Sequence, residues 1–163
     1  MRRGMRVAFL AAVTLICVAF AGLAPVRAAP FKDYEGRYEG WGVMRLANGQ
    51  VERIRCIADY MTEAAGTELR QALRCASPSV RIEATGRMSA QGDGKVDGTW
   101  LEHVFNVRGT ISGLATDQGF ALTIVGPTFS AAMDVIQAGC RQSLSISPQG
   151  FNIDRISIGL SRC

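Results

Sequence analysis

The sequence is poor in the residues that most enzymes use for catalysis and for metal binding. It contains one histidine, His103, and it lacks a Gly-x-Ser-x-Gly elbow, a His-Glu-x-x-His helix and a phosphate-cradling glycine loop. One histidine cannot complete a typical zinc site unless free cysteines join it. Glu102 precedes His103, but adjacent strand residues point to opposite faces. We therefore expect no catalytic residue, cofactor or metal, and an enzyme built on this pair is the less favoured hypothesis.

A calcium loop is excluded for a similar reason. Residues 93–98 begin like such a loop, with two aspartates and two glycines. However, Lys95 occupies a ligand position, and Val104 stands where the twelfth position requires glutamate. The segment is better interpreted as a hairpin turn.

The first 28 residues contain no acidic side chain, which changes how the charge should be interpreted. The formal net charge of +4 comes from 18 Lys+Arg and 14 Asp+Glu. Four of the arginines lie at positions 2, 3, 6 and 27, so the rest of the chain carries as many bases as acids. This balance removes the argument from net charge for nucleic acid or an anionic membrane as a partner.

That segment has the three parts of an export signal. Three arginines precede an apolar run over residues 7–23, Pro25 follows it, and Val26-Arg27-Ala28 offers small residues at the cleavage positions. We expect cleavage after Ala28 and a single mature domain, residues 29–163, in the periplasm or outside the cell. An uncleaved signal anchor is the alternative. No second apolar run approaches the roughly 20 residues of a membrane helix, so we expect no transmembrane segment in the mature chain.

Four cysteines remain after the signal: Cys56, Cys75, Cys140 and Cys163. An even number in an exported chain predicts two disulfides. A hairpin about the bond between residues 65 and 66 places Cys56 opposite Cys75, at a separation that suits a disulfide. Cys140 and Cys163 form the second pair by elimination. A turn over residues 147–150 would place Cys140 opposite Ser157, so Cys163 would have to reach around as the chain end.

Short runs of alternating apolar and polar residues, separated by glycine-rich turns, predict an all-β protein. The Asn48-Gly49 pair is the strongest of these turn signals. Residues 62–74 could form a short helix, but a strand suits the cysteine register. Eight to ten antiparallel strands in an up-and-down meander would close into a small barrel, because closure removes the sheet edges. The expected strands cover residues 37–46, 51–61, 68–76, 79–89, 95–106, 108–115, 119–126, 128–137, 140–147 and 152–161.

Two tryptophans in glycine-containing motifs carry a resemblance to known proteins. Trp41 lies in Gly40-Trp41-Gly42 on the first strand, and Trp100 follows Gly98 on a later one. The pattern resembles calycin-like barrels, such as lipocalins and avidins, and small exported β-barrel proteins of proteobacteria. The first resemblance implies that Trp41 packs across a closed barrel end beside a late arginine, Arg155 or Arg162. The alternative is that both tryptophans are ordinary core residues.

The first half of the mature chain is rich in arginine, from Arg37 to Arg81. These arginines could form an anion-binding face, but the acidic residues among them favour a solvated strand face. The favoured function is therefore a non-catalytic envelope protein that binds a small apolar ligand in the barrel lumen. The alternative is a protein-interaction or structural envelope factor, possibly an inhibitor, with a solid core. The predicted lining residues are Trp100, Phe120, Leu122, Phe129 and Met133.

Overall fold

Ten strands form where the sequence alternates between apolar and polar residues. The computed structural model describes residues 29–163, so the predicted signal and its cleavage site after Ala28 lie outside the described residues. The segment that could have been a helix, residues 62–74, contains the end of β2, a short 3-10 turn, η1 (Ala64–Gly66), and most of β3. The strands are β1 (Gly36–Leu46), β2 (Val51–Glu63), β3 (Glu68–Ala76), β4 (Arg81–Ala90), β5 (Lys95–Glu102), β6 (Val107–Ala115), β7 (Gly119–Val125), β8 (Ser130–Ala138), β9 (Arg141–Gln149) and β10 (Ile153–Ser161).

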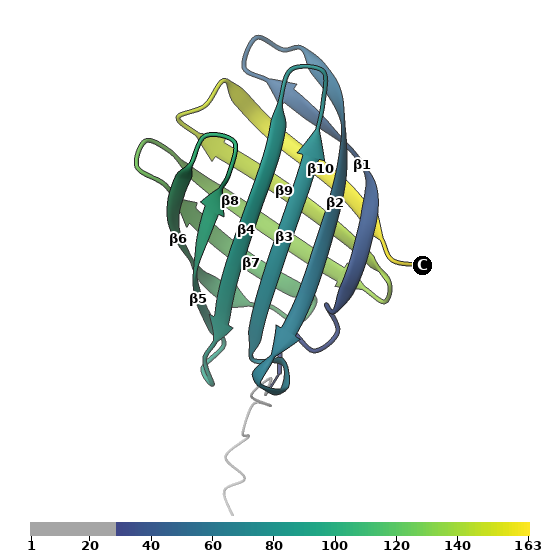
Figure 1. The fold of residues 1–163 in the computed structure, drawn as a ribbon, viewed down its shortest axis with the longest axis vertical. Helices are drawn as coiled ribbons and strands as arrows, with labels where there is room; N and C mark the ends of the chain where they lie inside the picture. Colours follow the sequence, from purple (N-terminus) through teal and green to yellow (C-terminus); the bar gives the residue numbers. More distant parts are fainter. Residues whose placement is uncertain (1–28) are drawn as a thin grey trace, which may run out of the picture.

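The strands form a closed antiparallel barrel, as predicted. Each strand pairs with its neighbours in the sequence, and β1 pairs with β10 to close the ring. Figure 1 shows β2–β5 in front of β7–β10, with the strands of the two layers crossing. Within residues 29–163, no helix reaches the length and apolarity that crossing a membrane requires.

Inward-facing glycines are placed where the sheet bends from one layer to the other. A Cβ atom at Gly40 or Gly42 of β1 would overlap backbone carbonyl oxygens of β10. The same overlap occurs at Gly98 against β4, and at Gly109 and Gly113 against β7. Glycines at such positions let neighbouring backbones approach closely and let a sheet turn a corner. The sheet can therefore close into a flattened barrel at β1 and at β5–β6.

The predicted hairpin between β2 and β3 is confirmed. Cys56 lies opposite Cys75, and the two form a disulfide with 4.1 Å between their Cα atoms. Both side chains point into the barrel and are buried. The alternation pattern was sufficient to predict this disulfide, because only one strand register fits the turn and also places the apolar side chains on one face.

The second disulfide is Cys140–Cys163, with a Cα–Cα distance of 5.8 Å. The predicted turn over residues 147–150 is wrong, because β9 continues to Gln149 and the turn covers residues 150–152. Pro148 lies in β9 opposite Ala131 of β8. The register between β9 and β10 therefore differs from the predicted one, which placed Cys140 opposite Ser157. The Arg162 N–H donates to the Cys140 carbonyl at 3.0 Å. Cys163 is then next to Cys140 and does not have to reach around the barrel.

Candidate functional site

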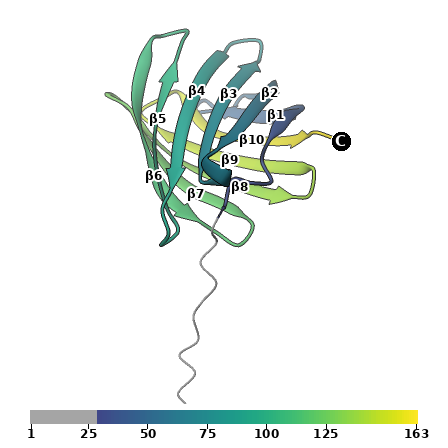
Figure 2. The ribbon, with the colours of Figure 1, turned by 60° about the horizontal axis from the view of Figure 1, so that its bottom comes forward.

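The two ends of the barrel differ in how they are filled. We call the end that holds the start of β1 and the last residues of the chain the closed end. The closed end also carries the hairpin loops over residues 64–67, 91–94, 116–118 and 139–140. The opposite end, which we call the mouth, carries the other five hairpin loops. These mouth loops cover residues 47–50, 77–80, 103–106, 126–129 and 150–152. Figure 2 shows the barrel turned so that the closed end comes forward.

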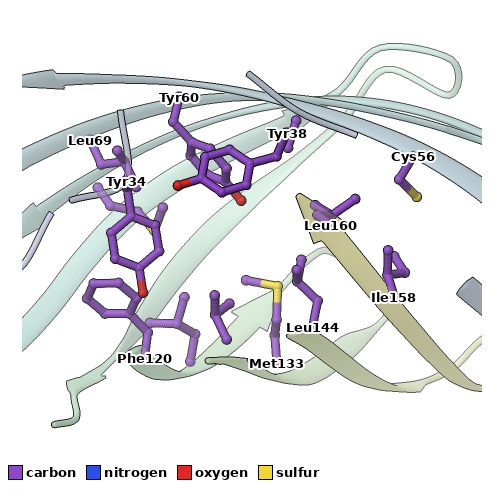
Figure 3. Close-up of a cluster of buried hydrophobic side chains, with 14 of the residues drawn as sticks. Tyr34, Tyr38, Cys56, Tyr60, Leu69, Phe120, Met133, Leu144, Ile158 and Leu160 are labelled. Atoms are coloured by element: carbon purple, nitrogen blue, oxygen red, sulfur yellow. The ribbon is translucent and has the colours of Figure 1, made fainter. Parts of the chain in front are cut away.

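A short segment before β1, residues 29–35, plugs the closed end. The Phe31 N–H donates to the Gly66 carbonyl at 3.0 Å, and the Phe31 ring stacks on Phe120 with 4.9 Å between centroids. Tyr34 packs on the same Phe120 ring at 5.1 Å. Phe31 is 0% exposed and Phe120 is 4% exposed. The closed end is therefore filled by aromatic packing, as Figure 3 shows for Tyr34, Phe120 and their neighbours.

A polar layer lies among these buried aromatic rings. The Tyr60 hydroxyl donates to Gln142 Oε1 at 3.0 Å and accepts from Gln71 Nε2 at 3.3 Å. Burial of the Tyr60 hydroxyl raises its pKa above the ordinary value, and this effect outweighs the two amide hydrogen bonds. Gln142 is 3% exposed, and its carbonyl oxygen is satisfied by Tyr60. The layer fixes the orientation of the Tyr60 ring across the barrel.

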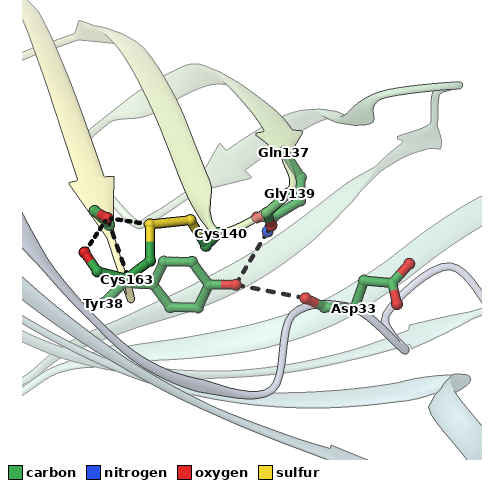
Figure 4. The surroundings of a disulfide bond; sticks show 7 residues. Asp33, Tyr38, Gln137, Gly139, Cys140 and Cys163 are labelled. Carbon is green, nitrogen blue, oxygen red and sulfur yellow. Dashed lines mark hydrogen bonds between the residues drawn. A yellow bond between two sulfur atoms is a disulfide. The ribbon is translucent and has the colours of Figure 1, made fainter.

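Tyr38 takes the position that the resemblance gave to Trp41. Tyr38 is 0% exposed, and the Arg162 guanidinium lies over its ring, 5.3 Å from the centroid. Figure 4 shows the Tyr38 hydroxyl between Gln137, which donates to it at 3.0 Å, and the Asp33 carbonyl, next to the Cys140–Cys163 disulfide. The implied packing of Trp41 across the closed end is wrong.

Trp41 points outward instead and is 53% exposed. Its neighbours Gly40 and Gly42 occupy the inward positions of β1, so alternation places the indole on the outer face. Arg53 lies over the Trp41 ring at 4.9 Å and Arg55 at 5.8 Å. Arg155 lies opposite Arg45 on the outer face. Trp41 is therefore not a core residue either, and two guanidinium groups lie over its exposed ring.

Near the mouth, Met44, Ile54 and Cys75 are buried, but several other inward apolar side chains are only half-buried. These side chains pack against the core, and the strand registers direct them inward. At the closed end, most inward apolar side chains are 0–7% exposed, although Ala90 and Ala115 are half-buried. The half-buried set near the mouth is therefore a group of inward apolar side chains that solvent partly reaches. We call the half-buried set the cup: Leu73, Ile82, Ala84, Trp100, Ile124, Ile146 and Ile153.

An aromatic cluster borders the cup. The rings of Trp100 and Phe129 are 5.3 Å apart, and Phe129 lies 4.4 Å from Phe151. Trp100 stands between Gly86 and Gly109 in the register, and a Cβ at Gly109 would lie 2.8 Å from the indole Nε1. Gly109 therefore gives the indole room to lie flat against β6.

The predicted lining residues divide between the two regions. Trp100 and Phe129 are half-buried at the mouth and contact each other. Phe120, Leu122 and Met133 are 4%, 4% and 7% exposed and belong to the packed core. The structure therefore brings together two of the five, and Phe120 instead contacts the plug. The cup residues Ile82 and Ile153 were missed, although both occupy apolar positions of alternating strands.

His103 and Glu102 do not act on each other. The Glu102 carboxylate accepts from the backbone N–H groups of Glu83 at 3.0 Å and Phe105 at 2.7 Å. His103 is exposed, and its Nε2 lies 3.0 Å from the Thr85 hydroxyl. Among the described residues, no cluster of three or more His, Cys, Asp or Glu side chains could hold a metal ion. Both residues therefore serve to hold the loop over residues 103–106.

The arginine-rich outer face is mostly neutralised. Arg37 pairs with Glu39 and Asp59, and Arg74 also pairs with Asp59. The guanidinium of Arg37 lowers the pKa of the Glu39 carboxyl by hydrogen bonding. Arg70 and Arg81 have glutamate partners in the same way. A shallow outer groove of about 950 Å³ crosses β2–β6 beside this face. The pairing supports the interpretation of a solvated strand face.

No protein-family model matches the sequence, and no curated protein matches it. The site must therefore be interpreted from its own geometry.

Proposed function

We propose that this chain is a non-catalytic exported protein of the cell envelope that holds a small apolar molecule in the cup. The observation that supports it is the group of half-buried, inward apolar side chains near the mouth. Apolar side chains exposed at an open lumen gain free energy when a ligand removes them from water, at about 25 cal/mol per Å². Ligand sites are typically concave and mostly apolar in this way. The periplasm or the extracellular space suits two disulfides.

The cup has the chemistry of a site for an aliphatic or aromatic group. Branched aliphatic side chains line it, and Trp100 and Phe129 form one side. The one acid beside it, Glu102, already accepts two backbone hydrogen bonds. A charged ligand group would find no partner in such a wall, so we infer that the buried part of the ligand is uncharged.

A cup-filling variant tests the proposal. In Ala84→Phe, the new ring occupies the space beside Leu73, whereas Ala132→Phe adds the same ring on the exposed outer face of β8. A hydrophobic fluorescent probe should bind the folded wild type saturably and change Trp100 emission. Binding should weaken at least tenfold in Ala84→Phe and stay unchanged in Ala132→Phe.

The alternative is an interaction or structural factor, possibly an inhibitor, and the solid packing of the closed end favours it. Under that hypothesis, the wild type shows no saturable probe binding, and Trp100→Ala mainly lowers stability, by about 3–5 kcal/mol. This pair of results would replace the ligand proposal with the alternative.

A further inference from the structure

The mouth loops carry no ionised side chain. They contain no Asp, Glu, Lys or Arg, and His103 is their one titratable residue. The segments at the closed end differ, since they include Lys32, Asp33, Asp93 and Asp117. Surface loops of a protein that meets only water are usually charged, because such groups keep them solvated. The absence of charge is therefore a property of one end of the barrel.

The tips of these loops expose large apolar side chains. Phe105 is 73% exposed, Phe151 is 51% exposed and Val104 is 44% exposed. Phe151 also continues the aromatic cluster of Phe129 and Trp100 at the cup. Val104, Phe105 and Phe151 lie on two of the five mouth loops, 103–106 and 150–152, and we call them the apolar rim. Aromatic side chains in such positions favour the boundary between a lipid bilayer and water.

Behind the rim, the outer face carries arginines without acidic partners. Arg45 and Arg155 lie directly opposite each other on β1 and β10, an arrangement that is unfavourable unless an anion is near. Arg53 lies three residues after the mouth loop 47–50, and Arg108 lies two residues after the loop 103–106. None of these four arginines forms an ion pair with any residue from 29 to 163 in the structure. We call them the arginine collar.

The acids near the mouth are mostly engaged elsewhere. Glu52 accepts from the Ser77 hydroxyl at 2.6 Å and the Ser79 N–H at 3.2 Å, and these hydrogen bonds lower the pKa of its carboxyl. Glu83 pairs with Arg81. Asp154, beside Arg155, is the acid without such a partner. The collar therefore presents a local positive charge, although the net charge of residues 29–163 is zero.

We propose that the mouth docks on the surface of an anionic phospholipid bilayer. The apolar rim would enter the boundary of the hydrocarbon layer, where an ionised loop would be unfavourable. A strand rises about 3.3 Å per residue, so the collar lies some 5–10 Å behind the rim, within reach of the phosphate groups. Uncharged apolar tips would thus meet the hydrocarbon, and the arginines behind them would meet the phosphate groups, which is the order of these layers in a leaflet.

The benefit of docking to the protein rests on the proposed function, the binding of an apolar molecule in the cup. A cup that opens at the docked face receives an apolar molecule from the bilayer without passing it through water. The exposed rim is then the route by which the ligand enters, which explains why the rim and the cup lie at the same end of the barrel.

Vesicle cosedimentation of the folded protein tests the docking. We expect binding to phosphatidylcholine vesicles that contain a quarter phosphatidylglycerol, and weaker binding to pure phosphatidylcholine. The double variant Phe105→Ser, Phe151→Ser should bind at least tenfold less to both. Leu114→Ser is the matched control, because Leu114 is 53% exposed on β6 near the closed end. It should bind like the wild type.

Charge reversal tests the collar separately. Each cation near an anionic surface contributes about fivefold to the affinity. The variant Arg45→Glu, Arg155→Glu should therefore lose roughly 25-fold or more on anionic vesicles, and little on neutral ones. Raising the salt concentration should reduce the preference of the wild type for anionic vesicles, because exposed charges are screened.

The outcomes distinguish this inference from the proposed function. Wild type that binds the soluble probe but no vesicle refutes docking and leaves the ligand proposal intact. Vesicle binding without probe binding supports docking and refutes the cup. Vesicle binding that survives in the phenylalanine double variant overturns the docking geometry. An apolar rim that binds no vesicle but mediates a complex with an envelope protein would identify the partner as protein instead.

Discussion

The two ends of this barrel are made from the same alternation of residues and yet behave differently. At the closed end, the plug of residues 29–35 adds aromatic rings to the inward side chains, and the space is filled. At the mouth, no equivalent segment from residues 29–163 enters, and Trp100 and Ile82 remain half-buried. The comparison teaches that alternation alone determines which side chains face inward. Whether those side chains form a core or a cup depends on what closes the end.

The most direct way to break this comparison is to remove one phenylalanine from each end. Phe31→Ala should lower the free energy of unfolding by about 3–5 kcal/mol, because Phe31 is 0% exposed. Phe129→Ala should lower it by about 1 kcal/mol, since the half-buried ring already contacts water. Denaturant unfolding monitored by circular dichroism measures both. Equal losses would mean that the mouth is packed as tightly as the closed end.

Two glycines with left-handed backbones test the plug itself. Gly66 (φ +90°) is buried against Lys32, whose Cα would lie 3.2 Å from an added Cβ, whereas Gly49 (φ +86°) has open space around it. Gly49→Ala should cost about 1–2 kcal/mol from backbone strain alone. Gly66→Ala should cost a further 1 kcal/mol or more, because the plug must move. Thermal unfolding compares the two, and a similar loss in both variants would contradict the role of the plug.

The buried hydroxyl of Tyr60 makes a smaller, pH-dependent contribution. Its pKa is raised in the folded state, so the unfolded chain releases this proton first. The stability that the protonated hydroxyl provides is therefore complete below about pH 10, the ordinary value for tyrosine, and falls as the pH rises further.

Tyr60→Phe should remove that alkaline dependence. At neutral pH it should cost about 1 kcal/mol, since Gln142 loses its hydrogen-bond donor. Urea unfolding of both proteins between pH 8 and 11 measures the difference in their free energies of unfolding. The other titrating groups are the same in both proteins, so their effects cancel. A stability gap that stays constant with pH would show that Tyr60 is not buried in solution.

The fold was predictable because short-range signals determine a meander. The observed bounds of β3 agree with the expected residues 68–76, and the Asn48-Gly49 turn forms as predicted. Cys56 and Cys75 pair because the hairpin register follows from one turn. The turn between β9 and β10 was misplaced because Pro148 is a turn signal in most contexts. Here it ends a strand beside Ala131 instead.

The candidate site was only partly predictable. Alternation tells which face a residue occupies, but it does not give the depth of that residue along the barrel axis. Phe120 and Phe129 are therefore equivalent in the sequence, although one packs on the plug and the other borders the mouth. Trp41 was assigned inward from its glycine neighbours, whereas those glycines are themselves the inward residues. The uncharged composition of the five mouth loops was visible in the sequence once the loops were known to share one end.

The pairing of β1 with β10 has a consequence for how the barrel assembles. The other nine pairings join consecutive strands, so each can form early as a local hairpin. The β1–β10 seam joins residues more than a hundred positions apart, and loop-closure entropy makes such contacts late and slow. Before the seam closes, the chain is an open sheet with two free edges that could pair with other chains. Gly40 and Gly42 lie in that seam, where they let β10 approach closely. Because these glycines allow the seam to close, they also determine when the two free edges disappear.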